Sequence, residues 1–144
     1  MEEYLWIGQL SKQLGISSPT IRYYEKLGLI DPPERTHAGY RLYSQAHRDR
    51  LKFIQKAKRF GLSLDEIEQL IAVHQNGKPP CREFQQMLQE HIDGLDRNLQ
   101  EMWDFREELR RKYEQIEIEL ANHRSDLLED ICQGTICKFI ERDS

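Results

Sequence analysis

The first half of the chain folds around one stretch of sequence, Ser18-Pro19-Thr20-Ile21-Arg22-Tyr23-Tyr24-Glu25-Lys26-Leu27-Gly28. Ser18 is a good helix N-cap, and Pro19 suits the first helical position, where its missing N–H costs nothing. Gly28 can adopt the left-handed backbone that ends a helix. A shorter helix is predicted before this one, over residues 7–14, and Gly15 ends it in the same way. Two short helices joined by a glycine-containing turn indicate a helix-turn-helix.

The residues after this motif predict a small wing and two more helices. Pro32 and Pro33 exclude a helix, and the turn residues at 37–39 favour a short two-stranded hairpin. A third helix is predicted over residues 44–60. Ser63 and Glu66 have the spacing of a capping box, which opens a fourth helix ending near residue 74. The predicted head covers residues 1–75, and a linker covers residues 76–80.

The most regular pattern of the chain lies in its second half. Apolar side chains recur there at alternating spacings of four and three residues, which is typical of a coiled coil. A single helix cannot bury so narrow an apolar seam by itself, so we expect a second copy of the chain as its partner. The predicted dimerisation helix covers residues 81–128, and an effector loop and tail covers 129–144, with a helical turn at 138–141. The seam positions are Leu88, Ile92, Leu95, Leu99, Met102, Arg106, Leu109, Tyr113, Ile116, Leu120, His123 and Leu127.

Charge divides the chain into two halves with different expected partners. The formal net charge of the 144 residues is −4. Residues 1–78 hold 12 Lys and Arg against 9 Asp and Glu, which leaves the remainder with 9 against 16. Phosphate would attract the first half and repel the second, so we expect nucleic-acid contact only in the head. No apolar run is long enough to span a membrane and no secretory signal is evident, so a cytoplasmic location is expected.

The predicted second helix is the candidate for reading base edges. Arg22 can bond guanine in the major groove, and hydroxyl groups suit phosphate oxygens. Arg41 on the wing, with Tyr40 or Tyr43 beside it, would hold the DNA backbone. Of the adjacent Tyr23 and Tyr24, one is expected to pack in the core instead. The residues predicted to contact DNA are Thr20, Arg22, Tyr23, Tyr24, Arg35, Tyr40, Arg41 and Tyr43.

Several of these segments resemble the signature of the MerR family in order and spacing. They are IGQLS at 7–11, TIRYYEKLGLI at 20–30, GYRLY at 39–43 and FGLSLDEI at 60–67. The resemblance covers about half of the chain and implies a mainly α fold, with a winged helix-turn-helix head and a long antiparallel coiled-coil dimerisation helix. It also implies a homodimer on an inverted repeat inside a promoter with an overlong spacer. An effector then makes the dimer kink and untwist double-stranded DNA, so that RNA polymerase can use the promoter.

The effector class is predicted from three cysteines at the two ends of the coiled coil. An odd number of cysteines argues against a disulfide framework. Cys81 precedes the dimerisation helix, and Cys132 and Cys137 follow it. In an antiparallel dimer the start of one helix meets the end of the other, so Cys81 of one chain could meet Cys132 and Cys137 of its partner. This arrangement resembles the metal sensors of the family.

The thiol set favours a soft divalent metal ion. In the metal-sensing subgroup a cysteine at the head of the dimerisation helix accompanies divalent ions. Three thiolates favour Hg²⁺, with Pb²⁺, Cd²⁺ or Zn²⁺ as alternatives. Zinc prefers four tetrahedral ligands and would need a further donor. His74 and His123 are possible additional ligands.

The separation between Cys81 and the C-terminal pair is longer than is usual in metal sensors of this family, by roughly two heptads. If Cys81 faces Cys132, the dimer axis falls near Arg106, and the two Arg106 side chains would repel each other unless Asp104, Glu107 or Glu108 neutralises them. The alternative is a shorter pairing in which the C-terminal segment folds back. Of the three cysteines, Cys132 is the one whose assignment as a metal ligand depends most on which of these two alignments is correct.

Other functions stay open on the sequence alone. The cysteines could be incidental in a regulator of organic ligands, or Cys132 and Cys137 could form a redox-sensitive disulfide. A coiled-coil scaffold or DNA-architectural protein is a third possibility. No nucleophile–base pair and no phosphate-cradling glycine loop is present, so the sequence predicts that the protein is not an enzyme.

Overall fold

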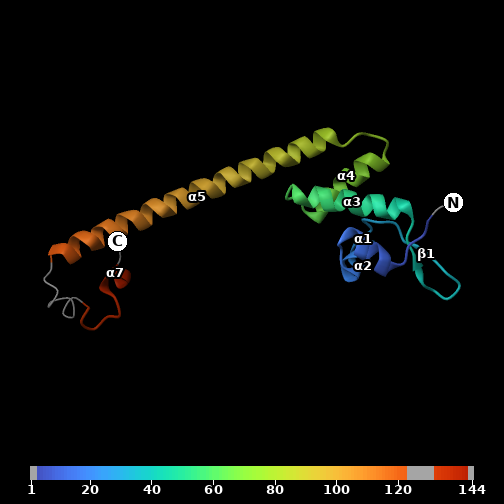
Figure 1. The fold of residues 1–144 in the computed structure, drawn as a ribbon. Helices are drawn as coiled ribbons and strands as arrows, with labels where there is room; N and C mark the ends of the chain where they lie inside the picture. Colours follow the sequence, from blue (N-terminus) through green and yellow to red (C-terminus); the bar gives the residue numbers. More distant parts are fainter. Residues whose placement is uncertain (1–2, 123–131, 143–144) are drawn as a thin grey trace. The chain divides into compact units, whose positions relative to one another are not determined.

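The computed structural model describes residues 3–122 and 132–142, most of them helical (Figure 1). It confirms the mainly α fold, with a helix-turn-helix head, a wing and a long helix in the second half. The chain divides into two compact units, residues 1–92 and residues 93–144. Within the described ranges the wing is the only sheet, and no described helix is long and apolar enough to cross a membrane.

The helix-turn-helix consists of α1 (Ile7–Leu14) and α2 (Ser18–Leu27). Gly15 ends α1 with a φ of 66°, a conformation that glycine adopts without strain. The N-cap of α2 is Ser17, one residue earlier than predicted, and its hydroxyl accepts the amide of Thr20 at 3.3 Å. The prediction missed by one position because proline is tolerated throughout the first turn, where no amide has an intrahelical acceptor.

The wing pairs β1 (Glu34–Arg35) with β2 (Arg41–Leu42) in an antiparallel hairpin. Gly39 takes a φ of 84° in its turn, where a side chain would be strained. The chain start adds to this hairpin, because Leu5 and Tyr43 exchange backbone hydrogen bonds of 2.9 Å in both directions. The predicted wing is therefore present, and it is tied to the N-terminal segment.

Two further helices, α3 (Gln45–Arg59) and α4 (Leu64–Gln75), complete the head around one apolar core. Each helix of the head contributes the side chains of one face, as expected for amphipathic helices. The side chains that are essentially without solvent contact are Leu10, Ile21, Leu29, Ile30, Tyr43, Leu51, Ile54 and Ile67.

The long helix α5 runs from Cys81 to Asn122, and its first turns pack with the head. Met87 is 7% exposed and Phe84 packs against the core of the first unit. Further along, the predicted seam leaves its apolar side chains in solvent. The predicted end of this helix, with His123 and Leu127, lies outside the described residues. A final turn, α7 (Lys138–Glu141), lies where a helical turn was predicted.

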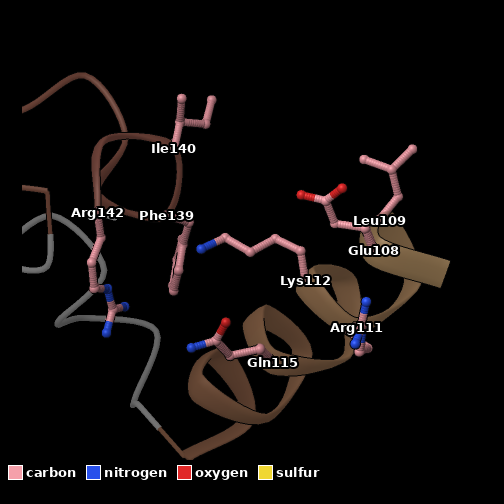
Figure 2. Close-up of a pocket in the computed structure, with 8 residues that line it drawn as sticks. All are labelled: Glu108, Leu109, Arg111, Lys112, Gln115, Phe139, Ile140 and Arg142. Atoms are coloured by element: carbon pink, nitrogen blue, oxygen red, sulfur yellow. The ribbon is translucent and has the colours of Figure 1, made fainter. Parts of the chain in front are cut away.

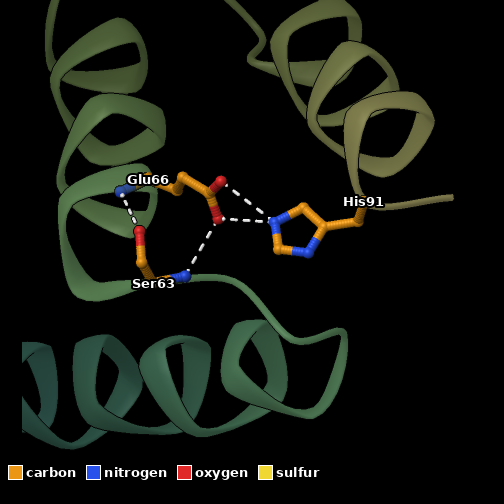
Figure 3. A network of polar contacts seen from close by, with 3 residues as sticks. All are labelled: Ser63, Glu66 and His91. Carbon is orange, nitrogen blue, oxygen red and sulfur yellow. Dashed lines mark hydrogen bonds and ion pairs between the residues drawn. The ribbon is translucent and has the colours of Figure 1, made fainter. Parts of the chain in front are cut away.

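The N-terminus of α4 is held by a capping box that also bonds to α5 (Figure 3). The Ser63 hydroxyl accepts the Glu66 amide at 3.2 Å, and a Glu66 carboxylate oxygen accepts the Ser63 amide at 2.9 Å. Nε2 of His91 lies 2.9 and 3.0 Å from the two oxygens of the same carboxylate. Burial raises the pKa of Glu66, but the hydrogen bonds from Ser63 and His91 outweigh it and leave the pKa below its ordinary value.

Substitution Glu66→Gln should lower the free energy of unfolding at pH 7 by about 0.5–1 kcal/mol, because it removes a charge at a helix N-terminus. Because the pKa of Glu66 is lowered in the folded protein, its carboxylate stabilises the fold at pH values above the ordinary pKa of 4.5. This contribution is lost as the pH falls through the folded-state pKa. The difference between wild type and variant should therefore shrink in urea unfolding as the pH is lowered from 5 to 3. Glu68→Gln, an exposed change on the same helix, is the control. Equal pH dependence of the two variants would contradict the assignment.

Candidate nucleic-acid interface and thiol groups

The helix α2 has one face in the core and one face in solvent. Ile21 and Tyr24, three residues apart, are 0% and 5% exposed. Arg22 and Tyr23 point outward, and Tyr23 is 50% exposed. The Thr20 hydroxyl lies 2.7 Å from that of Ser17 at the start of the helix. The outer face of α2 thus carries a guanidinium and a phenol that are free to meet a ligand from outside.

Two of the tyrosines predicted to contact DNA are core residues instead. Tyr24 is 5% exposed, and Tyr43 has no exposed surface. Burial, followed by the nearby charge of Glu25, raises the pKa of Tyr43. One of Tyr23 and Tyr24 was expected in the core, and the helical spacing from Ile21 selects Tyr24. Tyr43 was expected at the surface, but it belongs to the same buried core as Leu5, with which its backbone pairs. Of the adjacent tyrosines, Tyr23 is the exposed one.

The wing is joined to α2 by an ion pair that the sequence did not reveal. Nε of Arg41 lies 3.1 Å from the Glu25 carboxylate, and both side chains are partly buried. Arg35 donates to the carbonyl of Gly39 at 2.8 Å, within the hairpin. Contacts within the head therefore fix the positions of both wing arginine side chains.

Two aromatic side chains lie exposed beside the wing. Tyr40 is 64% exposed and packs edge-on against Trp6, with ring centroids 6.0 Å apart. Trp6 is itself 47% exposed and was not among the predicted contact residues. Its adjacency to Tyr40 depends on the N-terminal segment joining the hairpin, which is a tertiary feature. Arg22 and Tyr23 of α2 and the Trp6–Tyr40 pair beside the wing are thus exposed aromatic and basic side chains of the first unit.

All three thiols are free. Cys81, exposed at the start of α5, lies at an apolar pocket of about 180 Å³ whose walls include Phe53, Phe60 and Phe84. Cys132 and Cys137 are partly exposed in the second unit. Among the described residues of one chain, no three histidine, cysteine or acidic groups are gathered closely enough to hold a metal ion. His74 is exposed at the end of α4, and His123 lies outside the described residues.

Models of two protein families match the chain. The first, described as MerR HTH family regulatory protein, matches residues 5–73. The second, described as MerR, DNA binding, matches residues 48–112. The two together span the head, the linker and most of α5, so the family likeness extends beyond the motifs of the head.

Curated relatives and solved structures agree with these matches. The mercuric resistance operon regulatory protein of Bacillus cereus is 41% identical over 96 residues, which cover 67% of this chain and 73% of that protein. The Haemophilus influenzae HTH-type transcriptional regulator ZntR homolog is 33% identical over 134 residues, 93% and 96% of the two chains.

Among solved structures, the transcription regulator PbrR691 of Ralstonia metallidurans, crystallised with lead(II), matches with a TM-score of 0.67 and 30% identity. The match covers 76% of this chain and 86% of that one. The resemblance seen in the sequence is thereby confirmed. The chain belongs to the MerR family of helix-turn-helix DNA-binding transcription regulators, and these are not enzymes.

Proposed function

We propose that this regulator is a homodimer that senses a thiophilic divalent metal ion, with Hg²⁺ favoured, and activates a promoter by distorting its DNA. The observation that carries the proposal is the set of three free thiols at the two ends of the coiled-coil segment. It is supported by one relative whose name refers to mercury and by a similar structure that was crystallised with lead(II).

On DNA, Arg22 and Tyr23 of α2 would enter the major groove, and Thr20 would add a hydroxyl at the start of that helix. Arg35, Tyr40 and Arg41 of the wing would contact the backbone. The Arg41–Glu25 ion pair keeps the wing aligned with α2, so base readout and backbone contact occur in one register. Such a dimer would act on RNA polymerase indirectly, through the shape of the promoter.

The chemistry of the donors fits a soft metal ion. Three thiolates without an oxygen ligand suit Hg²⁺ or Pb²⁺, whereas Zn²⁺ or Cd²⁺ would need a further donor such as His74 or His123. We assign Cys81 of one chain and Cys132 and Cys137 of the partner subunit as ligands. Each site then needs both chains, and an ion held there would favour one arrangement of the dimer over another.

Substitution Arg22→Ala should weaken binding to the DNA upstream of the protein's own gene by about 1–3 kcal/mol, because a side chain that reads guanine is lost. Fluorescence anisotropy with a labelled fragment measures this change. Arg110→Ala, on the exposed surface of α5, is the matched control and should leave the affinity unchanged. An unaltered affinity for Arg22→Ala would show that α2 is not the reading helix.

Titration of the reduced protein with Hg²⁺ should produce a thiolate-to-metal absorbance band that saturates at one ion per chain. Cys81→Ser should abolish or strongly weaken the band, because one soft donor is removed from each site. Parallel titrations with Pb²⁺, Cd²⁺ and Zn²⁺ rank the ions. A band of equal strength in Cys81→Ser would exclude the shared site, and the absence of any band in wild type would leave the cysteines incidental.

A further inference from the structure

The hydroxyl of Tyr43 is a buried polar group that has no hydrogen-bond partner among the residues that the structure describes. The side chain has no exposed surface, and its ring is fixed from two sides. The backbone of Tyr43 pairs with that of Leu5, and the ring packs edge-on against His47 with centroids 5.5 Å apart. A buried hydroxyl without a partner is unfavourable and uncommon in folded proteins, so its presence calls for a physical explanation.

The charges that act on this hydroxyl come from α2 and the wing. Burial raises the pKa of Tyr43, and the Glu25 carboxylate raises it further. The cations of Arg41, Arg22 and Arg35 oppose this change. Because the pKa lies above its ordinary value of 10.0, the hydroxyl keeps its proton at neutral pH and remains a donor. Glu25 is the anion that acts on it most strongly, and a carboxylate is a good acceptor for such a proton.

The Glu25 carboxylate has capacity for a second donor. Nε of Arg41 donates to Oε2 of Glu25 at 3.1 Å. A carboxylate can accept about four hydrogen bonds on its two oxygens, so this contact uses only part of its capacity. The Glu25 side chain is 17% exposed, which limits the water that can solvate its charge. Loss or weakening of the bond from Arg41 would therefore be costly unless another donor replaced it.

A phosphate at Arg41 would weaken that bond. The contact with Glu25 engages the Nε edge of the guanidinium and does not use the two Nη groups, which suit a phosphate. The Arg41 side chain is 34% exposed, so a ligand from outside can reach it. A bound phosphate competes for the charge of the guanidinium and repels the carboxylate behind it.

Resting on the backbone contact proposed above for Arg41, we infer that Glu25 and Tyr43 are positioning residues for the DNA phosphate. Glu25 holds the guanidinium by its Nε, and the Tyr43 hydroxyl donates to the Glu25 carboxylate when a phosphate binds to Arg41. The hydroxyl is thus a reserve donor that keeps the partly buried carboxylate hydrogen-bonded in the complex. Because this bond forms only with DNA, it contributes to DNA affinity and not to the stability of the free protein.

Substitution Tyr43→Phe in the full-length protein keeps the packed ring and removes only the hydroxyl. It should weaken binding to the DNA upstream of the protein's own gene about three- to tenfold, the effect of one hydrogen bond, measured by fluorescence anisotropy. The urea midpoint of the free protein should stay the same or rise, because an unpaired buried group is lost. A lower urea midpoint or an unchanged DNA affinity would overturn the inference.

A double-mutant cycle with Arg41→Ala tests whether the hydroxyl acts through Arg41. Tyr43→Phe should have no further effect on DNA affinity in the Arg41→Ala protein, and an undiminished effect there would overturn the inference. Tyr24→Phe, a change of another core tyrosine, is the matched control and should have the same effect in both backgrounds. Full affinity of Arg41→Ala would remove the proposed backbone contact and the inference with it. A weakened Arg41→Ala with an unaffected Tyr43→Phe would remove the inference alone.

The exchange of donors can also be measured without DNA. Removal of Arg41 takes away the donor of the partly buried Glu25 carboxylate, so the Tyr43 hydroxyl should bond to it in the free protein. Tyr43→Phe should therefore lower the urea midpoint of the Arg41→Ala protein, although it does not lower that of wild type. Equal effects of Tyr43→Phe on the two midpoints would overturn the inference, because the hydroxyl would then not serve Glu25.

Discussion

The side chains of Leu95, Leu99 and Met102 expose 61–68% of their surface on α5. A row of such residues along one helix face is unfavourable in water. The apolar seam therefore demands a partner. The second copy of α5 proposed above would cover the seam with the same residues, and the proposed thiol site would form only as a consequence of that pairing.

In the head, one face of α2 packs in the core while the opposite face must remain available to an external ligand. Its inner face, with Ile21 and Tyr24, holds the helix in the core, and this leaves Arg22 and Tyr23 at fixed positions outside. The ion pair between Glu25 and Arg41 then sets the wing relative to the same helix. Specific DNA recognition depends on such alignment, since base contacts and backbone contacts must be made together.

Local sequence signals were sufficient to predict most of the helices and turns of the fold. Glycines at 15 and 28 end α1 and α2, Ser63 and Glu66 open α4, and two prolines exclude a helix from the wing. Each of these features depends on interactions among a few neighbouring residues, so the local sequence is enough to predict it. Where the prediction missed, as with Ser17 in place of Ser18, two adjacent serines offered the same capping group.

Contacts between distant residues were not predictable in this way. Burial of Tyr43 requires the N-terminal segment to pair with the wing, and His91 meets Glu66 across 25 positions of sequence. The ion pair between Arg142 and Glu119 joins residues 23 positions apart and brings the C-terminal segment back to α5 (Figure 2).

The sequence by itself thus determined the helix-turn-helix, the wing, the apolar seam and the presence of three thiols, because each depends on residue type and spacing. Only the tertiary structure decided which aromatic side chains remain outside and which residue of α5 pairs with the C-terminal segment. Those outcomes depend on which surfaces the folded chain brings together.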